Sequence, residues 1–224
     1  MKILLAASGG GHVRQILDLE PFWSRHDTWL LTEDTPLGRS IAERVPTRYV
    51  AHFAFGQRRT AGWWKMLRSG AANLRDSWRI VESVKPDLLI STGAGSALFA
   101  LLLARWRGAE TVVVESFARF DAPSLFGRLA RRFATHLVVQ SAALAGTWPE
   151  AHVCDPFRIV AAPRPAKTAT AVVTVGTVMP FDRLVAGVAA LQAAGDLPEH
   201  VFAQVGEGGA CPAGFDCVEG TSFA

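Results

Sequence analysis

The fold is decided by the stretch ILLAASGGGHVRQILDL, residues 3–19, close to the start of the chain. Residues 3–7 form a short apolar run of the kind found in a strand that is buried on both faces. Residues 8–11 form a glycine turn, and residues 13–19 carry apolar side chains at helical spacing. The stretch therefore predicts a strand, a tight loop and a helix, which is the repeating unit of a parallel sheet.

The same unit recurs along the first 160 residues. Strands are predicted at residues 28–32, 48–52, 87–91, 111–115 and 137–140, and helices at residues 37–44, 61–84, 96–107 and 124–133. Strands that alternate with helices predict the α/β class, with a parallel sheet covered by helices on both faces.

Residues 161–170 differ in character from what precedes them, because they are rich in Pro, Ala and Thr and have no apolar period. This composition is typical of a linker between domains. A second unit at 171–224 then predicts a strand at 171–175, a helix at 181–194 and a strand at 201–205. About one and a half such units are too few for an independent α/β domain. We expect either a truncated second domain of a longer enzyme or a tail that packs on the first domain.

Composition narrows the class of protein. The chain has 224 residues, of which 50% are hydrophobic and 19% charged, as in ordinary globular proteins. The net charge of +3 argues only weakly for anionic partners. No helix-turn-helix or interleaved basic and aromatic surface indicates nucleic-acid binding.

The cysteines and the apolar runs indicate the cellular compartment that we expect for the protein. The three cysteines, Cys154, Cys211 and Cys217, have neither zinc-site nor redox-motif spacing, and we expect a reducing cytosol. The first apolar run ends at Ser8, too early for a secretory signal. The longest apolar run, residues 97–104, is far shorter than the roughly 20 residues that span a bilayer. A soluble or peripheral protein is therefore expected.

Three glycine-containing loops follow predicted strands: residues 8–12, residues 92–95, and Gly176-Thr177. Ligands of parallel sheets bind at the carboxyl ends of the strands. Glycine lets backbone N–H groups approach an anion, and the following helix directs its positive end toward it. A tight strand-to-helix turn also favours glycine on structural grounds alone. None of the loops has the G-x-G-x-x-G spacing of nicotinamide enzymes.

Two side chains at these loops could carry chemistry. His12 follows three glycines at a helix start, where a lowered pKa would favour the neutral, basic imidazole. Its alternative is a surface histidine in a turn. Glu115 ends an apolar strand, where a carboxylate can bind sugar hydroxyls or act as a base. Its alternative is a salt bridge to Arg119.

The segment 58–84 predicts a basic, tryptophan-rich amphipathic helix. Such a helix is attracted to an anionic bilayer surface, although packing of its apolar stripe on the sheet is the alternative. We expect membrane contact at Trp63, Trp64, Lys65 and Arg68. The apolar stripe consists of Trp64, Leu67, Ala71, Leu74 and Trp78, and the adjoining basic stripe of Lys65, Arg68, Arg75 and Arg79.

Three motifs in this order resemble a known family: SGGGH at 8–12, TGAG at 92–95, and VESFAR at 114–119 followed by PSLFGRL at 123–129. They look like the anchoring subunit of the two-part UDP-GlcNAc transferase of lipid-linked oligosaccharide synthesis. Bacterial exopolysaccharide glycosyltransferases carry the same pattern. A more distant similarity links the chain to the peptidoglycan lipid-linked GlcNAc transferase. The resemblance covers roughly residues 1–160.

Residues 171–224 resemble the start of the catalytic partner, through VTVGT at 173–177, FDRL at 181–184 and FAQVG at 202–206. The chain therefore looks like a fusion of the two halves. The resemblance implies a GT-B fold, with an N-terminal Rossmann-like parallel-sheet domain at 1–160 and a partial second Rossmann-like domain. The family's later donor-binding segment has no counterpart here, so the resemblance leaves open whether the chain is active by itself.

The resemblance implies an inverting transfer of a sugar from a UDP-sugar to a polyprenyl-diphosphate-linked sugar, on the cytoplasmic face of the cell membrane. No cofactor is expected, and no metal, because no Asp-x-Asp motif is present. His12 is the expected base, with Glu115 as its competitor. The expected acceptor-binding residues are Ser8, Gly9, Gly10, Gly11, Thr92, Gly93, Gly95, Ser116 and Arg119, and the donor-binding residues are Gly176 and Thr177.

Two other functions compete with this hypothesis. One is a non-catalytic subunit that binds membrane and acceptor and recruits a separate catalytic chain. The other is a UDP-sugar epimerase of similar fold, which needs no lipid acceptor and leaves the basic helix with Trp63 and Trp64 unexplained.

Overall fold

The computed structural model describes residues 1–8, 10–53, 63–155, 166–175 and 180–220. The chain forms two compact units, Met1–Ala161 and Ala162–Ala224, which are treated separately below. The division falls at the start of the segment rich in Pro and Ala that the sequence predicts to be a linker.

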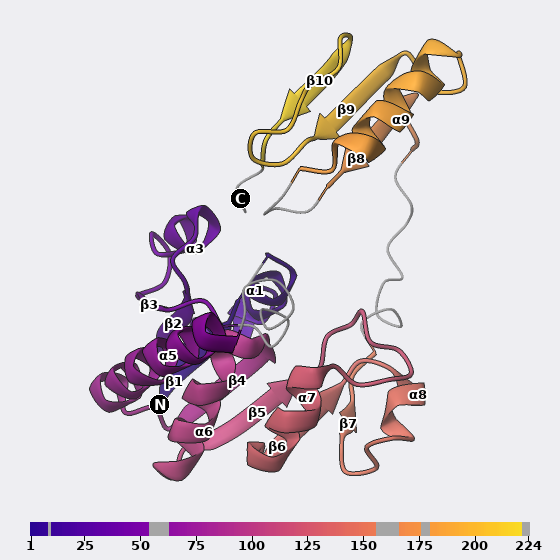
Figure 1. Ribbon diagram of the computed structural model, residues 1–224. Coiled ribbons are helices and arrows are strands. Elements are labelled where there is room, and N and C mark those ends of the chain that lie inside the picture. The colour runs from indigo at the N-terminus through magenta and orange to yellow at the C-terminus, as the bar shows by residue number, and fades with distance from the viewer. Residues whose placement is uncertain (9, 54–62, 156–165, 176–179, 221–224) are drawn as a thin grey trace. The chain divides into compact units, whose positions relative to one another are not determined.

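The first unit is built on a seven-stranded sheet in the order β3-β2-β1-β4-β5-β6-β7, and every neighbouring pair of strands is parallel (Figure 1). The α/β class predicted from the alternating pattern is confirmed. The strands are β1 (Lys2–Ala7), β2 (Asp27–Glu33), β3 (Thr47–Val50), β4 (Leu88–Gly93), β5 (Glu110–Val114), β6 (His136–Val139) and β7 (His152–Val153).

The strand order reverses at β1. From β1 the chain builds outward through β2 and β3 on one side, and then returns to place β4 on the other side. β1 is an interior strand between β2 and β4, and its residues 3–7 are no more than 1% exposed. In open parallel sheets ligands bind at the carboxyl ends of the strands where the order reverses. The topology therefore predicts a ligand site at the loops that follow β1 and β4.

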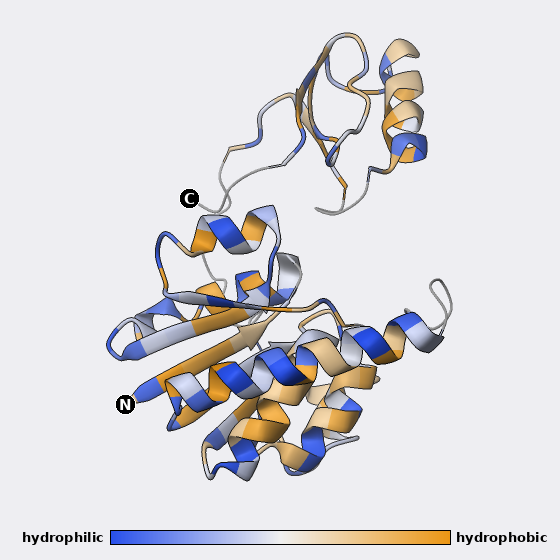
Figure 2. Ribbon diagram, turned by 60° about the vertical axis from the view of Figure 1, so that its left-hand side comes forward, coloured by the Kyte–Doolittle hydropathy of each residue, from blue (hydrophilic) through white to orange (hydrophobic). Residues whose placement is uncertain are grey.

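Helices cover the sheet on both faces, and α5 packs beside α6. Figure 2 shows the hydrophobic central strands and the many hydrophilic residues along α5. The helical segments of this unit are α1 (Gly10–Leu17), α2 (Glu20–Trp23), α3 (Pro36–Ile41), α5 (Trp63–Val84), the 3₁₀ turn η1 (Gly95–Ala97), α6 (Leu98–Trp106), α7 (Leu125–Ala130), the 3₁₀ turn η2 (Arg131–Phe133) and α8 (Ala142–Ala145).

The face by which α5 packs differs from what its apolar stripe suggests. Small and polar residues turn inward in the first part of the helix, where Gly70, Asn73 and Ser77 are buried. Asn73 Nδ2 donates to the Ala51 carbonyl at 2.6 Å, and Ser77 Oγ donates to Asn73 Oδ1 at 3.2 Å. Leu74 and Trp78 consequently remain exposed. Burial of the apolar stripe on the sheet is therefore wrong for Leu74 and Trp78, whereas the end of the helix does pack on the core through Ile80, Val81 and Val84.

Element boundaries agree with the sequence pattern in most places. α1 begins at Gly10 rather than at Val13, so two of the glycines form its first turn. The helix predicted at 124–133 is α7 followed by η2. The two-residue strand β7 and the one-turn helix α8 were not predicted, because segments this short carry no measurable period.

The second unit is a three-stranded parallel sheet in the order β10-β9-β8 with the helix α9. Val173, Val185, Val201, Ala203 and Val205 form its core. Its elements are β8 (Thr170–Thr174), α9 (Asp182–Ala193), β9 (His200–Gln204) and β10 (Phe215–Val218), of which β10 was not predicted.

The cysteines depart from the expectation drawn from their spacing. Cys211 and Cys217 form a disulfide that joins β10 to the loop before it, and Cys154 is free and exposed. Sequence spacing did not indicate this pair, because the bridge depends on the turn that brings β10 back beside β9.

Candidate active site

The loops after β1 and β4 are joined by hydrogen bonds at the point where the strand order reverses. The Ser8 N–H donates to the Gly93 carbonyl at 3.1 Å. Thr92 Oγ1 donates to the His12 carbonyl at 2.7 Å. The sequence-predicted residues Ser8, Gly10, Gly11, His12, Thr92, Gly93 and Gly95 therefore belong to one edge of the sheet, whereas Gly9 lies outside the described residues.

The imidazole of His12 lies against Gly93. A Cβ atom on Gly93 would lie 3.0 Å from His12 Cε1 and 3.1 Å from His12 Nδ1. Gly93 also has a φ of +110°, which residues with side chains rarely adopt. Both the backbone conformation and the contact with the imidazole therefore require glycine at this position.

His12 has the properties of a neutral base. Its Nδ1 atom is buried and has no hydrogen-bond partner among the described residues. Burial lowers the pKa of His12, while a hydrogen bond with the Thr92 backbone and the charge of Glu115 act in the opposite direction. Burial, rather than the helix start assumed from sequence, is the main cause. The imidazole is thus mostly neutral at pH 7 and can accept a proton.

Glu115 has a structural role in the fold, and its predicted competition with His12 as a base stays a prediction. It is only 3% exposed, and its carboxylate accepts hydrogen bonds from Ser116 N at 2.8 Å and from Ser124 N and Oγ at 3.0 Å each. A Cβ on Gly127 would collide with this carboxylate. Ser124 also caps α7 by accepting from Gly127 N at 2.9 Å. Glu115 therefore ties the end of β5 to the start of α7.

The salt bridge between Glu115 and Arg119 is not formed in the part of the chain that the structure describes. Arg119 is exposed, and its backbone N–H donates to the Ser116 carbonyl at 2.9 Å. Ser116 is half-buried, and its hydroxyl accepts from Ala118 N at 3.3 Å. Ser116 and Arg119 thus belong to a turn after β5, the strand beside β4.

Sequence reasoning missed a polar cluster that holds the loop after β4. Ser96 Oγ donates to Glu33 Oε1 and accepts from Phe53 N at 3.1 Å. His52 Nδ1 lies 2.8 Å from the same Glu33 oxygen. Glu33 and His52 follow different strands, so only the folded sheet brings them together. An acidic residue at the end of an apolar strand was the available signal for Glu33.

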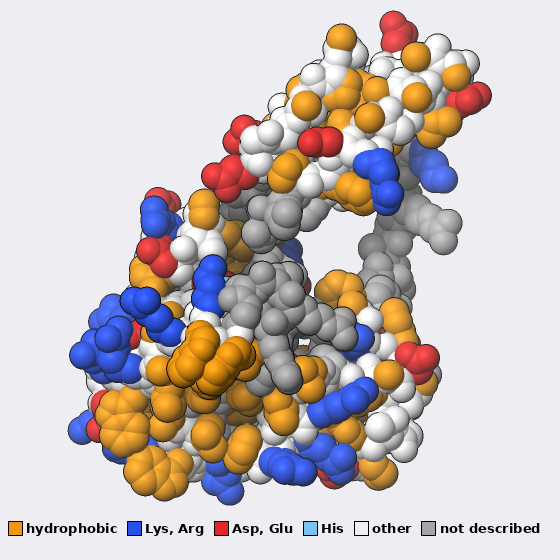
Figure 3. All heavy atoms as spheres, in the orientation of Figure 1, with side chains coloured by type: hydrophobic (Ala, Val, Ile, Leu, Met, Phe, Trp, Pro, Cys, Tyr) orange, Lys and Arg blue, Asp and Glu red, His pale blue; other side chains and the backbone are white. Residues whose placement is uncertain are grey.

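The membrane residues expected from sequence are exposed on the first turns of α5. Trp63 and Trp64 are 52% and 70% exposed, and Lys65 and Arg68 are exposed as well. Figure 3 shows hydrophobic side chains gathered over α5 and α6, with lysine and arginine side chains beside them. In the described part of the chain, no helix has the length and apolar character needed to cross a bilayer.

The exposed apolar surface continues along α5 to the end of α6. Trp78 and Trp106 are 41% and 68% exposed, and their ring centroids lie 5.8 Å apart. The Arg107 guanidinium lies over both rings, at 4.9 and 5.2 Å from their centroids. Exposed tryptophans interleaved with cations are typical of surfaces that meet lipid headgroups.

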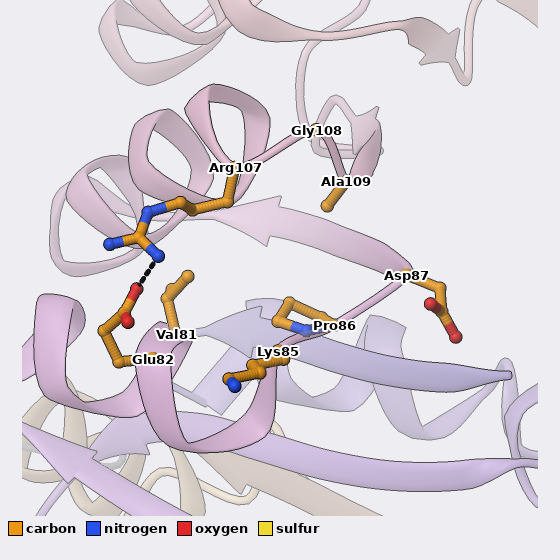
Figure 4. A pocket seen from close by; sticks show the side chains of 8 residues that line it. All are labelled: Val81, Glu82, Lys85, Pro86, Asp87, Arg107, Gly108 and Ala109. Atoms are coloured by element: carbon orange, nitrogen blue, oxygen red, sulfur yellow. Dashed lines mark ion pairs between the residues drawn. The ribbon is translucent and has the colours of Figure 1, made fainter.

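A cavity of about 400 Å³ lies away from the His12 loop (Figure 4). It is lined by the segments that enter β4 and β5, including Lys85, Asp87, and the ion pair of Glu82 with Arg107. These segments lie at the amino ends of the strands. Since ligands of parallel sheets bind at the carboxyl ends, this cavity is not the candidate active site.

Gly176 and Thr177, the predicted donor-binding residues, lie outside the described residues. The described elements on either side are β8, which ends at Thr174, and α9, which begins at Asp182.

Comparison with curated proteins gives one relative of clear sequence similarity. No family model matches the chain. The chain is 33% identical over 153 residues to the UDP-N-acetylglucosamine–N-acetylmuramyl-(pentapeptide) pyrophosphoryl-undecaprenol N-acetylglucosamine transferase of Synechococcus sp. (strain WH7803). The match covers 66% of the chain and spans 41% of the length of that relative.

Solved structures share the fold at low sequence identity. MurG of Acinetobacter baumannii matches with a TM-score of 0.57 and 16% identity, and the match covers 97% of this chain and 67% of the MurG chain. The glycosyltransferase of kitacinnamycin matches with a TM-score of 0.62 and 11% identity, over 98% of this chain and 71% of the other. A UDP-GlcNAc 2-epimerase of Methanocaldococcus jannaschii, solved with UDP-GlcNAc and UDP, matches with a TM-score of 0.58 and 10% identity, over 91% of this chain and 65% of the epimerase chain. The chain thus has the α/β fold of GT-B glycosyltransferases, which epimerases also use.

Proposed function

We propose that the chain is a glycosyltransferase that moves a sugar from a UDP-sugar to a polyprenyl-diphosphate-linked acceptor, with inversion at the anomeric carbon. The observation that carries the proposal is the buried Nδ1 of His12, which has no partner in the described part of the chain and is held against Gly93 where the strand order reverses. The name of the Synechococcus relative, a transferase acting on a pyrophosphoryl-undecaprenol substrate, supports the choice of donor and acceptor.

In this mechanism His12 removes the proton from the acceptor hydroxyl as its oxygen attacks the anomeric carbon. The new bond joins that oxygen to the sugar, and the bond between the sugar and the UDP diphosphate breaks. The electron pair leaves with UDP, and the proton is left on the imidazole. A single in-line displacement of this kind inverts the anomeric centre.

The glycine loops would bind the acceptor diphosphate. A Cβ on Gly11 would have no atom within 4 Å, so the first turn of α1 is open to a ligand. This turn contains no acidic residue, and its free N–H groups form the positive end of the helix dipole, which attracts an anion. Gly93 and Gly95 extend the same surface from the neighbouring loop. We assign to Gly176 and Thr177 the corresponding role toward the leaving UDP.

The exposed surface of α5 would place this site at the inner face of the membrane. Trp63, Trp64, Lys65 and Arg68 offer aromatic rings for the interface and cations for anionic headgroups. A buried histidine whose lowered pKa keeps it neutral is suited to accept a proton, which a transferase needs and an anchoring subunit does not. The arrangement therefore favours the enzyme over the non-catalytic anchor.

The direct test incubates the purified chain with a panel of UDP-sugars and a polyprenyl-diphosphate-linked N-acetylhexosamine in detergent micelles. Mass spectrometry of the lipid product should show the addition of one hexose, hexuronic acid or N-acetylhexosamine residue. Release of free sugar in the absence of acceptor, with no lipid product in its presence, would point to hydrolysis instead and contradict the transferase proposal.

Replacing the two exposed tryptophans should weaken membrane binding. In flotation with vesicles of phosphatidylethanolamine and phosphatidylglycerol, the double variant Trp63→Ala/Trp64→Ala should bind about tenfold less than the wild type, because it loses two interfacial anchors. Added salt should weaken wild-type binding by screening Lys65 and Arg68. The control is Phe181→Ala, which removes an aromatic ring that is 46% exposed in the second unit. Equal flotation of all three proteins would exclude α5 as the membrane surface.

A further inference from the structure

Two buried side-chain nitrogens in the first unit have no hydrogen-bond partner among the described residues, and both belong to α1. They are His12 Nδ1 and Gln15 Nε2. Residues three apart on a helix lie on the same face. Gln15 therefore shares with His12 the side of α1 that faces the carboxyl edge of the sheet.

The orientation of the Gln15 amide is set by its neighbour. Gln140, which follows β6, donates from Nε2 to the Glu115 carbonyl at 2.8 Å. The same nitrogen lies 3.5 Å from Gln15 Oε1. Because the Glu115 carbonyl fixes Gln140 Nε2 as a donor, the oxygen of Gln15 must face it. The Gln15 nitrogen is thereby turned away from Gln140 and left with two N–H groups to donate.

A buried donor without an acceptor is unfavourable, and such groups in native proteins call for a specific explanation. Gln15 lies beside Gln140, which follows β6 and is itself bonded to the Glu115 carbonyl at the end of β5, and it lies about one helical turn from His12. Its amide nitrogen has no acceptor among the described residues. A ligand bound at this edge would supply that acceptor.

We propose that Gln15 Nε2 donates a hydrogen bond to an oxygen substituent of the acceptor sugar, beside the hydroxyl whose proton His12 removes. This inference rests on the proposed function and names a residue that determines acceptor specificity. Three residues along a helix correspond to a rise of about 4.5 Å, which one sugar ring can bridge. The diphosphate is better matched by the N–H groups of Gly10 and Gly11, at the other end of the same helix face.

The test compares two substitutions at Gln15. Gln15→Met keeps the length of the side chain and removes both polar atoms. Gln15→Glu keeps an oxygen that can face Gln140 and removes the N–H groups at neutral pH. The matched control is Asp18→Asn, which alters an exposed side chain just after the same helix, paired with Arg14 at 3.0 Å.

Binding is measured with polyprenyl-diphosphate-linked N-acetylhexosamine in micelles, and separately with the same polyprenyl diphosphate lacking the sugar. Both Gln15 variants should bind the sugar-bearing lipid about tenfold or more weakly than the wild type, and should bind the sugar-free lipid within twofold of it. In transfer assays the acceptor KM should rise while the KM for the UDP-sugar stays unchanged. The Tm of Gln15→Met should not fall, because no well-formed hydrogen bond is removed.

The outcomes separate this inference from the proposed function. Unchanged binding of the sugar-bearing lipid by Gln15→Met would overturn the role of Gln15, and so would an equal loss toward both lipids, which would indicate diphosphate binding. A wild-type chain that binds the sugar-bearing lipid but transfers no sugar to it would contradict the proposed reaction and leave the Gln15 contact standing. A wild-type chain that shows neither binding nor transfer would overturn both.

Discussion

The substitution His12→Ala should lower the turnover of sugar transfer by about 10²-fold or more, which is the usual scale for loss of a general base. The physical reason is that His12 Nδ1 is buried at the reversal of strand order without a partner among the residues that the structure describes, and its burial-lowered pKa keeps the imidazole mostly neutral. The measurement is kcat with saturating UDP-sugar and acceptor. The KM values should change much less, because the glycine loops remain in place.

The pH dependence of the wild-type rate should also report the titration of His12. Burial lowers the pKa of His12 below the ordinary value of 6.5, so the imidazole stays neutral, and the base stays active, to a lower pH than an exposed histidine would. Activity should fall only as the pH drops below that lowered pKa, and this acidic limb should vanish in His12→Ala. An exposed histidine on the edge strand β7 supplies the control: His152→Ala should leave both the rate and the pH profile unchanged. Wild-type turnover in His12→Ala would remove His12 from the mechanism.

The sequence predicted the framework of this site well because glycine and periodicity are local signals. The apolar run before Ser8 and the helical spacing after His12 fix β1 and α1 without reference to the rest of the chain. The glycine turn that begins at the end of β4, at Thr92 and Gly93, was predicted for the same reason. Parallel pairing of β1 with β4 then brings the two loops together.

The neighbours of His12 could not be predicted, because they are selected by tertiary contacts. A glutamine within a helix gives no sign of whether its amide is buried, so Gln15 passed unnoticed. Its partner Gln140 is 125 residues away in sequence. The structural role of Glu115 was missed for a related reason. A carboxylate at the end of a buried strand looks functional until Ser124, nine residues later, is seen to donate two hydrogen bonds to it.

The exposed stripe of α5 shows that hydrophobic periodicity alone does not predict which face of a helix is buried. Leu67, Leu74 and Trp78 have the spacing of a core-facing stripe, yet they are 49%, 41% and 41% exposed. The helix is buried instead through Gly70, Asn73 and Ser77, whose small size and hydrogen bonds suit close packing. A hydrophobic stripe identifies one face of a helix, but it does not decide whether that face meets the core or another surface.

The second large effect expected is on stability, from Glu115→Ala. The substitution leaves Ser116 N and the Ser124 N–H and hydroxyl without their buried acceptor, and should lower the free energy of unfolding by about 3 kcal/mol or more. Urea unfolding followed by tryptophan fluorescence reports the free energy of unfolding of the first unit, because all seven tryptophans lie in Met1–Ala161. The matched control is Glu150→Ala, which removes an exposed carboxylate paired with Arg131 and should cost no more than about 1 kcal/mol.

Glu115→Gln separates the structural role of this carboxylate from a catalytic one. The amide oxygen can still accept from one of the donors, so the protein should be less destabilised than Glu115→Ala. Measured under conditions where it is folded, its kcat should stay within about tenfold of the wild type, whereas loss of a general base costs about 10²- to 10⁴-fold. A folded Glu115→Gln with wild-type stability and a turnover reduced a hundredfold would restore Glu115 as the base. The expected pattern is the reverse, because this carboxylate is buried and bound by three hydrogen-bond donors of the chain itself.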